Sequence, residues 1–445
     1  MTRRRAPHPA VRDQHPCIED VEDSIVDGDR PITPGTARAA LRHRVFRIVV
    51  TGAFLSNIGS WMQNAVLAGY AYDLTHSKTF VGLLTAAQLA PLLALSLFGG
   101  YVADLLDRRR LIIWVSMEQL AFSVVLALIV RSPDPSRLAI FLAVLAVGVG
   151  QAVYAPAYSA VLPALVGPED LSGAISLNSA QMNGSRVIGP PIGGLLLHAF
   201  GPSWVFAGNA VTYLFVVGSL MMVRFPVQTA LKAGARGLRQ LVVGVRVARR
   251  DRVVGRSLIT IFIFSGFALG FVGQLASVVE DNLGIKADSA GYGLIYGTFG
   301  VGAMLGALSV GTVFAGWSKP RLVRIGMAGY AVTLVVFALL RSPALAYPTI
   351  LVLGFFYFGM VTSLSTALQE RLDDSVRGRV MALWVMGFGG TVGFANIFLG
   401  PLMDATSVTA VLLANSVVAF ALFFYADVRV PPGAPDLVAL PALAD

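Results

Sequence analysis

The sequence predicts an all-α membrane protein in which about twelve transmembrane helices form two bundles of six. Of its 445 residues, 56% are hydrophobic and only 13% are charged. That is too little charge to cover the surface of a soluble protein of this length. The mean hydropathy is +0.71. Long apolar segments recur along the whole chain, and the basic residues gather on one side of them, which is the pattern of a multi-pass membrane protein.

Each apolar segment is close to the roughly 20 helical residues that cross a hydrocarbon core of about 30 Å. Polar breaks separate the segments, as at 131–137, where two prolines interrupt the pattern. The predicted spans are 46–72, 79–102, 111–131, 137–163, 172–198, 203–224, 254–280, 288–315, 321–341, 345–368, 379–402 and 406–427.

The distribution of basic residues predicts the orientation. With the N-terminus inside, 28 of the 34 lysines and arginines fall on the cytoplasmic side and one, Arg186, falls within a helix. The five on the outside are Lys78, Arg131, Arg137, Lys286 and Arg341. This asymmetry places both termini in the cytoplasm and the chain in the cell membrane. It also accounts for the net charge of +9 without nucleic acid as a partner.

A basic loop, 225–253, divides the apolar segments into two groups of six. Within it Leu238, Val242 and Val245 recur at helical spacing beside arginines, which predicts an amphipathic helix on the anionic lipids of the inner leaflet. The predicted organisation is a disordered cytoplasmic tail (1–44), an N-terminal six-helix bundle (45–224), this basic linker (225–253), a C-terminal six-helix bundle (254–428) and a cytoplasmic tail (429–445).

The two halves show a weak internal repeat. A Ser-Gly step at Gly173 precedes the fifth span and an Arg-Gly step at Gly378 precedes the eleventh, and both spans then reach a Gly-Pro step, at Pro190 and Pro401. A parallel six-plus-six repeat is typical of one large class of transporters.

The loop between the second and third spans carries a recognisable motif. It has Gly100, then Asp104 four residues later, then Asp107 followed by Arg108, Arg109 and a third arginine. This resembles the signature loop of the major facilitator superfamily, and it lies at the loop where that family has it.

The fifth span carries a second motif. Gly184, Gly189, Pro190, Gly193 and Gly194 fall in a run that resembles the Gly-Pro-x-x-Gly-Gly motif associated with proton-coupled antiporters of that superfamily.

Further matches narrow the resemblance to the enterobactin-exporter-like branch, also called transmembrane secretion effectors, near macrolide efflux proteins. They lie at 73–79, 244–251 and 377–381, and the resemblance covers residues 45–428. It implies the twelve-helix major facilitator fold and export of siderophores, antibiotics or other metabolites. One departure concerns the fourth span, which has Gly148, Gly150 and Gln151 where many drug–proton antiporters carry an arginine. The usual proton route through that helix is therefore not carried over.

The signature loop predicts a conformational latch. Asp104 ends the second span at the cytoplasmic face, where free N–H groups at the start of the eleventh span, with Arg377 and Arg379, would attract its charge. The resemblance adds Gly100, Asp107, Arg108 and Arg109 to this latch. The alternative is that the arginines only set the topology.

Glycines predict a hinge between the halves. Those of the fifth span and of 288–315 follow small-residue spacing, which lets two helices approach closely, and Pro190 with Pro191 is expected to kink the fifth span. Static packing is the alternative reading.

Three polar and aromatic stripes predict a substrate pathway near the middle of the membrane. A single residue in such a stripe is as readily explained by helix packing, but the three together favour a cavity for an amphipathic solute. The stripes are Asn57, Trp61 and Asn64 in the first span, Gln151, Tyr154 and Tyr158 in the fourth, and Phe267, Phe271 and Gln274 in the seventh.

Two ionisable residues lie deep in predicted spans. A charge at mid-helix costs roughly 2.5–3.5 kcal/mol on insertion scales, so Glu118 and Arg186 are expected to face the bundle interior. Glu118 is a candidate proton carrier, unless it reaches the inner interface. Arg186 is a candidate for binding an anionic group of the substrate or for acting on a carboxylate, with a structural role at the proline kink as the alternative.

Together these observations predict a secondary exporter of a small molecule, amphipathic or anionic, driven by proton antiport. The alternatives are a facilitator that imports or flips nutrients or lipids, and a membrane sensor on the same fold. No glycine-rich phosphate loop precedes any of the four lysines, and no span carries a polar cluster for catalysis. The sequence therefore predicts no catalytic residue, no metal site and no cofactor.

Overall fold

The computed structural model describes residues 36–223, 238–372 and 374–429, and every regular element in this part of the chain is helical. The first half contains α2 Ala37–Ala40, α3 Arg44–Thr75, α4 Lys78–Leu105, α5 Arg108–Ile129, α6 Arg137–Val161, α7 Leu171–Phe200 and α8 Pro202–Met222. The second half contains α9 Leu238–Arg250, α10 Arg252–Ile263, α11 Leu275–Leu283, α12 Ala290–Gly311, α13 Lys319–Leu339, α14 Pro343–Arg371, α15 Asp374–Val385, α16 Thr391–Ala405 and α17 Val408–Tyr425.

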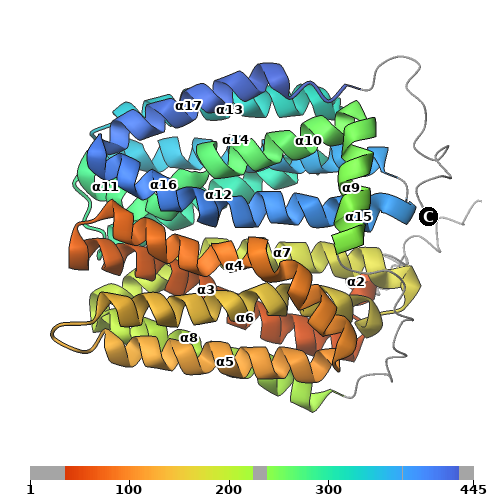
Figure 1. Cartoon of the computed structure of the whole chain (residues 1–445), viewed down its shortest axis with the longest axis horizontal. Helices are drawn as coiled ribbons and strands as arrows, with labels where there is room; N and C mark the ends of the chain where they lie inside the picture. Colours follow the sequence, from red (N-terminus) through yellow and green to blue (C-terminus); the bar gives the residue numbers. More distant parts are fainter. Residues whose placement is uncertain (1–35, 224–237, 373, 430–445) are drawn as a thin grey trace, which may run out of the picture.

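The long helices run side by side along the longest axis of the molecule (Figure 1). Helices α3, α5, α6 and α8 lie toward one edge, α10, α13, α14 and α17 lie toward the other, and α4, α7, α12 and α16 lie between them. This arrangement confirms the predicted all-α membrane fold with its two six-helix bundles. Most of the predicted tails, 1–35 and 430–445, and part of the linker, 224–237, lie outside the described residues.

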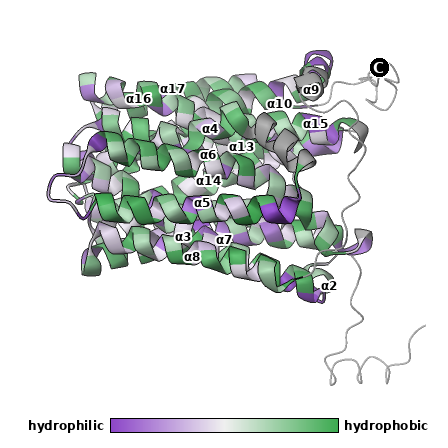
Figure 2. Ribbon diagram, turned by 60° about the horizontal axis from the view of Figure 1, so that its bottom comes forward, coloured by the Kyte–Doolittle hydropathy of each residue, from purple (hydrophilic) through white to green (hydrophobic). Residues whose placement is uncertain are grey.

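Eleven helical segments of the described chain are long and apolar enough to cross a membrane. The remaining predicted span corresponds to α7, which has 30 residues but carries Asn178, Gln181, Asn183 and Arg186. Figure 2 shows hydrophobic residues along the sides of the bundle and hydrophilic residues gathered at its two ends. An apolar belt between polar ends is the surface that a bilayer requires.

Side chains of Asp and Ser cap the starts of several spans, where backbone N–H groups have no partner within the helix. Asp107 accepts a hydrogen bond from the Arg110 amide (2.8 Å), and Asp251 accepts from the amides of Val253 and Val254 (2.9 and 3.0 Å). These caps fix where α5 and α10 begin. The linker helix α9 lies across the end of the bundle at which α2 also lies (Figure 1).

The seventh and eleventh spans are not continuous α-helices. A π turn, Phe264–Ala268, and a 3₁₀ turn, Gly270–Gln274, separate α10 from α11, and a second π turn, Met386–Gly390, separates α15 from α16. Glycines concentrate in both interruptions, and they tolerate the altered backbone. The Tyr330 hydroxyl donates to the Ala268 carbonyl (2.6 Å), which satisfies a backbone group that the regular helical ladder would otherwise bond.

Helices α7 and α12 touch backbone to backbone along what we call the α7–α12 seam. A Cβ atom on Gly194 would lie 3.0 Å from the Cα of Gly293, and one on Gly293 would lie 2.8 Å from the Pro190 carbonyl oxygen. Gly189 and Gly193 pack on the other side, against Trp61 and Met62 of α3, and Gly184 faces Phe54. The glycines of the predicted hinge therefore allow α7 to pack closely against α3 on one side and against α12 of the second half on the other.

The prolines of α7 contribute to this seam. Because Pro190 and Pro191 have no N–H, they leave the carbonyls of Arg186 and Val187 without their usual helical donors. Both carbonyl oxygens face glycines of α12: a Cβ on Gly300 would lie 3.2 Å from the first, and a Cβ on Gly297 would lie 3.4 Å from the second. Cα–H groups can donate weakly to such oxygens. Helix α7 remains one helix through the proline pair.

Helices α4 and α16 form a second contact of the same kind, the α4–α16 seam. Gly393 would place a Cβ 2.6 Å from the Ala90 nitrogen, Gly82 faces the Asn396 carbonyl, and Gly400 faces the Lys78 carbonyl. The two Gly-Pro steps that the sequence pairs, in α7 and α16, thus both lie in helices that join the halves.

The α7–α12 seam predicts that Gly293→Ala destabilises the protein. The new methyl group meets the Pro190 backbone, which cannot move aside without shifting α7, so we expect a loss of about 1–3 kcal/mol. Gly218→Ala in α8 is the matched control, because nothing lies within 4 Å of its added Cβ. Thermal unfolding in detergent should show a lower midpoint for the first variant and an equal or higher one for the second. Equal midpoints would mean that the seam does not hold the halves together.

Candidate functional site

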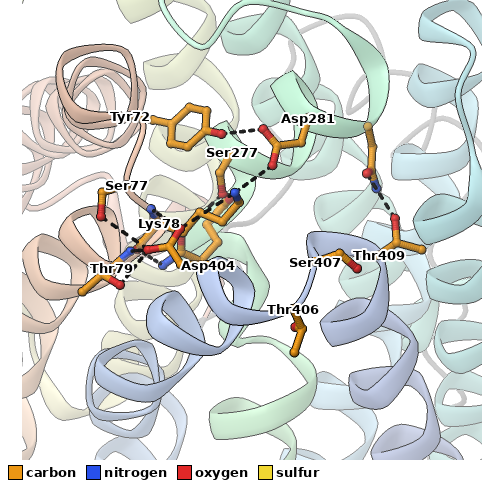
Figure 3. A network of polar contacts seen from close by, with 12 residues as sticks. Tyr72, Ser77, Lys78, Thr79, Ser277, Asp281, Asp404, Thr406, Ser407 and Thr409 are labelled. Carbon is orange, nitrogen blue, oxygen red and sulfur yellow. Dashed lines mark hydrogen bonds and ion pairs between the residues drawn. The ribbon is translucent and has the colours of Figure 1, made fainter.

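A polar network, here called the end network, joins the two halves at the end of the bundle opposite α9 (Figure 3). The Lys78 ammonium at the start of α4 lies 2.9 Å from Asp281 of α11 and 3.8 Å from Asp404 of α16. The lysine side chain is only 14% exposed. Tyr72 of α3 donates its hydroxyl to Asp281. Both acids come from the second half, so the network ties this end shut.

Asp404 also binds the start of α4 directly. It accepts hydrogen bonds from the Thr79 amide and hydroxyl (2.8 and 2.7 Å) and from the Lys78 amide (3.1 Å). A carboxylate at a helix N-terminus satisfies free N–H groups and interacts favourably with the helix dipole. The cap is unusual in coming from the opposite half of the protein, so opening this end would uncap α4.

Gln274 continues the connection inward. Its amide donates to the Lys78 carbonyl (3.1 Å) and to Asn396 (3.3 Å), and Asn396 donates to the Gly270 carbonyl (3.0 Å). Among the residues of the end network and its inward extension, the sequence identified Gln274 as a pathway residue but missed Asp281 and Asp404. The available signal in the sequence was that Lys78, Asp281 and Asp404 are charged residues at the ends of separate spans. Only the fold shows that they lie close together.

Arg186 lies midway along α7 between the halves. Its guanidinium carbon is 4.5 Å from the ring centroid of Trp61 on α3 and 4.9 Å from that of Phe358 on α14. Its Nε is buried and has no hydrogen-bond partner among the residues that the structure describes. Cation–π attraction stabilises a guanidinium that lies between two aromatic faces. The sequence predicted both Arg186 and Trp61 but not Phe358, which lies in an aromatic run typical of ordinary packing.

The polar residues of the first span bind neighbouring helices. Asn57 donates to Gln181 of α7 (3.0 Å), and Asn64 accepts from Gln88 of α4. With Trp61 between them, these side chains lie on the face of α3 that looks toward the two seam helices of its own half. The predicted stripe therefore forms, and its amides are hydrogen-bonded.

In the fourth span, Gln151 accepts a hydrogen bond from Gln119 of α5 (3.1 Å), while Tyr154 stacks on Tyr158 at 5.6 Å between ring centroids. The Tyr158 hydroxyl is buried and has no hydrogen-bond partner in the part of the chain that the structure describes. These residues lie within the first bundle, between α5, α6 and the neighbouring apolar cluster.

The third predicted stripe does not form one face. Phe267 is 55% exposed, Phe271 is fully buried against Phe299 and Phe337 inside the second bundle, and Gln274 lies between the halves. The prediction assumed a regular helix with 3.6 residues per turn, whereas the π and 3₁₀ turns change the register between these positions. Phe271 is therefore a core residue of the second bundle.

Glu118 lies in the first bundle, apart from Arg186. Its Oε2 is buried, has no hydrogen-bond partner within the described ranges, and lies against Gly150 of α6. No ion pair joins Glu118 to Arg186 in the parts of the chain that the structure describes. The predicted effect of the arginine on this carboxylate thus has no support in the geometry.

The latch residues lie at the α9 end. Arg108 donates to the Ala160 carbonyl at the end of α6 (3.0 Å), and Arg109 donates to the Leu220 carbonyl at the end of α8 (2.9 Å). Arginines favour helix C-termini, where carbonyls are free. Arg377 donates to the Leu372 carbonyl (3.2 Å), and the Arg379 backbone lies against Gly244 of α9.

Two latch positions, Gly100 and Asp104, are in the last turns of α4, where side chains lie outside the described residues. The proposed contact of Asp104 is thus not tested. In the described ranges, no group of three or more His, Cys, Asp or Glu side chains is arranged to hold a metal ion.

Comparison with known proteins finds relatives over nearly the whole chain. The model of the transmembrane secretion effector family matches residues 35–442. The enterobactin exporters EntS of Shigella boydii serotype 4 (strain Sb227) and Escherichia coli O1:K1 are each 27% identical over 353 residues, which is 77% of this chain and 81% of theirs.

Solved structures share the fold at lower identity. A mutant of the nucleoside transporter NupG superposes with a TM-score of 0.69 at 12% identity, covering 87% of this chain and 100% of its own. A bacterial homologue of the human lysosomal transporter Spinster, inward-facing and unoccupied, has a TM-score of 0.67 at 15% identity, covering 88% and 99%. At these identities the likeness concerns the fold alone.

The end network predicts that Asp404→Asn loosens the closed end. The substitution keeps the size but removes the charge that binds Lys78 and the start of α4, so we expect roughly fivefold faster modification beneath the network. The readout is labelling of Thr85→Cys, in a Cys17→Ser background, by an impermeant maleimide in intact cells, where this end is predicted to face outward. Asp134→Asn, an exposed acid at the same end, is the control and should label at the original rate. Identical rates in both variants would exclude the network as a gate.

Proposed function

The chain belongs to the transmembrane secretion effector family of the major facilitator superfamily, and from that premise we propose that it exports an amphipathic small molecule with an anionic group by proton antiport. It is an efflux-type membrane transporter, and its relatives are transporters rather than enzymes. The substrate class, the coupling ion and the roles of the residues are the proposal.

Arg186 is the observation that carries the proposed substrate class. It is a cation midway along a membrane helix, between Trp61 of one half and Phe358 of the other. Its buried Nε has no hydrogen-bond partner in the described part of the chain. A charge at this depth is expensive, so the presence of this arginine favours a functional role. Aromatic rings beside a guanidinium suit an amphipathic anion, whose apolar part packs while its charge pairs.

Alternating access would use the two seams and the end network. Glycines have no side chains that interlock across a seam, so one half can rock on the other without separating such contacts. Release of Lys78 from Asp281 and Asp404 would open the end at which the solute leaves. At the α9 end we propose that Asp104, with Arg377 and Arg379, forms the reciprocal latch. This latch would hold the α9 end closed while the end network is open.

Glu118 is the proposed proton carrier. Its Oε2 is buried and has no hydrogen-bond partner among the described residues, so its charge state should respond strongly to water entering the first bundle. Many drug–proton antiporters carry an arginine in the fourth span, whereas Glu118 is a carboxylate in the third span that lies against Gly150 of the fourth. Proton coupling here would thus use a carboxylate of α5.

We propose that α2, α9 and both termini face the cytoplasm of a cell whose membrane holds the protein, from the asymmetry of basic residues. Arg246, Arg249 and Arg250 on α9 are exposed, which suits contact with anionic lipids of the inner leaflet. The proposed partners are thus a small-molecule solute, protons and these lipids.

The substrate role predicts a graded response at Arg186. Arg186→Gln and Arg186→Ala should reduce efflux at least about tenfold, because the charge is lost, whereas Arg186→Lys should retain part of it. The measurement is efflux of enterobactin and of a macrolide from cells with matched expression, with Arg137→Ala, an exposed arginine, as control.

Full activity in Arg186→Ala would remove the residue from the mechanism. Equal loss in the lysine and alanine variants, together with a lower melting temperature, would instead assign it a structural role.

The proton role predicts that Glu118→Gln uncouples transport. Glutamine resembles the protonated acid and cannot exchange a proton, so downhill flux should persist while its acceleration by a pH gradient disappears. Flux in proteoliposomes with and without the gradient measures this, and Glu370→Gln, an exposed acid, should stay coupled. Normal acceleration in Glu118→Gln would contradict the assignment.

The orientation predicts opposite labelling at the two ends. On a Cys17→Ser background, an impermeant maleimide should modify Asp134→Cys in intact cells and Arg249→Cys only after the cells are permeabilised. The reverse pattern would invert the proposed topology.

A further inference from the structure

A groove of ≈ 820 Å³ lies on the flank of the second bundle, bordered by α13, α14 and α17. Its walls are apolar, formed by Ile325, Ala328 and Val332 of α13 with Phe356 and Phe423. Three arginines, Arg321, Arg324 and Arg429, line it as well. Helices α13 and α17 are at the edge of the molecule, away from the helices that join the halves (Figure 1). The groove is therefore separate from the transport pathway.

Two of these arginines, Arg321 and Arg324, carry a positive charge that no acidic side chain among the described residues neutralises. The Arg321 guanidinium lies 4.4 Å from the centroid of Trp317, and that of Arg324 lies 4.8 Å from the centroid of Phe423. Neither has an ion-pair or hydrogen-bond partner among the described residues. Stacking holds a guanidinium by its face and leaves its N–H edges free to bind an oxyanion.

The third arginine is already neutralised. Arg429 forms two hydrogen bonds with Asp427 (2.8 and 3.1 Å), which lower the pKa of that carboxyl to about 2. The carboxylate therefore stays ionised at physiological pH and cancels the charge of Arg429. The excess charge at the groove resides on Arg321 and Arg324.

The groove has the length of one membrane leaflet. Arg321 and Arg324 are in the first two turns of α13, at the same end of the bundle as α9. Val332 lies eleven residues beyond Arg321. At 1.5 Å per residue this is about 16 Å, half of a hydrocarbon core of about 30 Å. Ile325 and Val332 are 42% and 62% exposed, so the groove opens sideways toward lipid. Its charged end lies where phospholipid head groups lie.

We propose that this groove binds one anionic phospholipid from the leaflet at the α9 end. The phosphate lies between Arg321 and Arg324, and an acyl chain follows Ile325, Ala328 and Val332 between α13 and α17. Basic residues beside a membrane helix attract anionic head groups, and the apolar channel supplies the contact that a free phosphate would lack. This site differs from the surface of α9 and does not depend on which solute the protein exports.

The test uses the full chain in detergent, titrated with phosphatidylglycerol or phosphatidylcholine and followed by native mass spectrometry. We expect the wild type to bind a first phosphatidylglycerol about tenfold more tightly than phosphatidylcholine. Arg321→Gln with Arg324→Gln should abolish this preference. The control, Arg137→Gln with Lys286→Gln, removes the same charge elsewhere and should keep it.

Ala328→Trp retains both arginines but fills the groove, and it should also lose the tight phosphatidylglycerol. This second variant keeps the proposal testable if the arginine variant unfolds. Equal phosphatidylglycerol affinity in the two double variants, or wild-type binding by Ala328→Trp, would overturn the proposal. Displacement of the lipid by chain-free glycerol phosphate at the same concentration would also overturn it, because the site would then be one for a free phosphate.

Discussion

At two seams the halves of this protein approach each other so closely that backbone meets backbone at glycines, and this constraint shapes the rest of the structure. At the α7–α12 seam Gly194 faces Gly293, and at the α4–α16 seam Gly393 faces Ala90. Helices that approach so closely leave no room for polar side chains at the contact itself. Polar contacts between the halves accordingly lie beside the seams. Arg186 lies beside the first seam, and the end network closes one end of the second.

The seams and the end network differ in how easily they change. A backbone seam keeps its packing during small rotations, whereas moving apart would forfeit many close contacts. An ion pair that is partly open to water is worth roughly 0–1 kcal/mol. Asp281 and Asp404 are 31% and 32% exposed, so the links to Lys78 are of this weak kind. Weak polar links at an end, beside strong apolar seams at mid-membrane, suit a protein that opens its ends alternately.

The sequence predicted the fold and some of the residues that the structure brings together, and physical causes decide which features could be predicted. The spans follow from hydropathy because lipid imposes length and composition on each helix, and the charge of Arg186 is conspicuous at its depth. The glycines of α7 were readable because close packing requires them. Phe271 was misplaced because a π turn and a 3₁₀ turn break the helical register. The end network was missed because its residues come from separate spans, and only the fold brings them together.

We propose that the two ends of the protein open reciprocally about the two seams. Spin-label distances measured in lipid nanodiscs test it most directly, with one pair, Asp134→Cys and Ala344→Cys, reporting the network end and another, Leu106→Cys and Ser318→Cys, reporting the α9 end. In Asp404→Asn the account predicts that the first distance lengthens while the second shortens. Distances that stay unchanged, or that lengthen together at both ends, would contradict it.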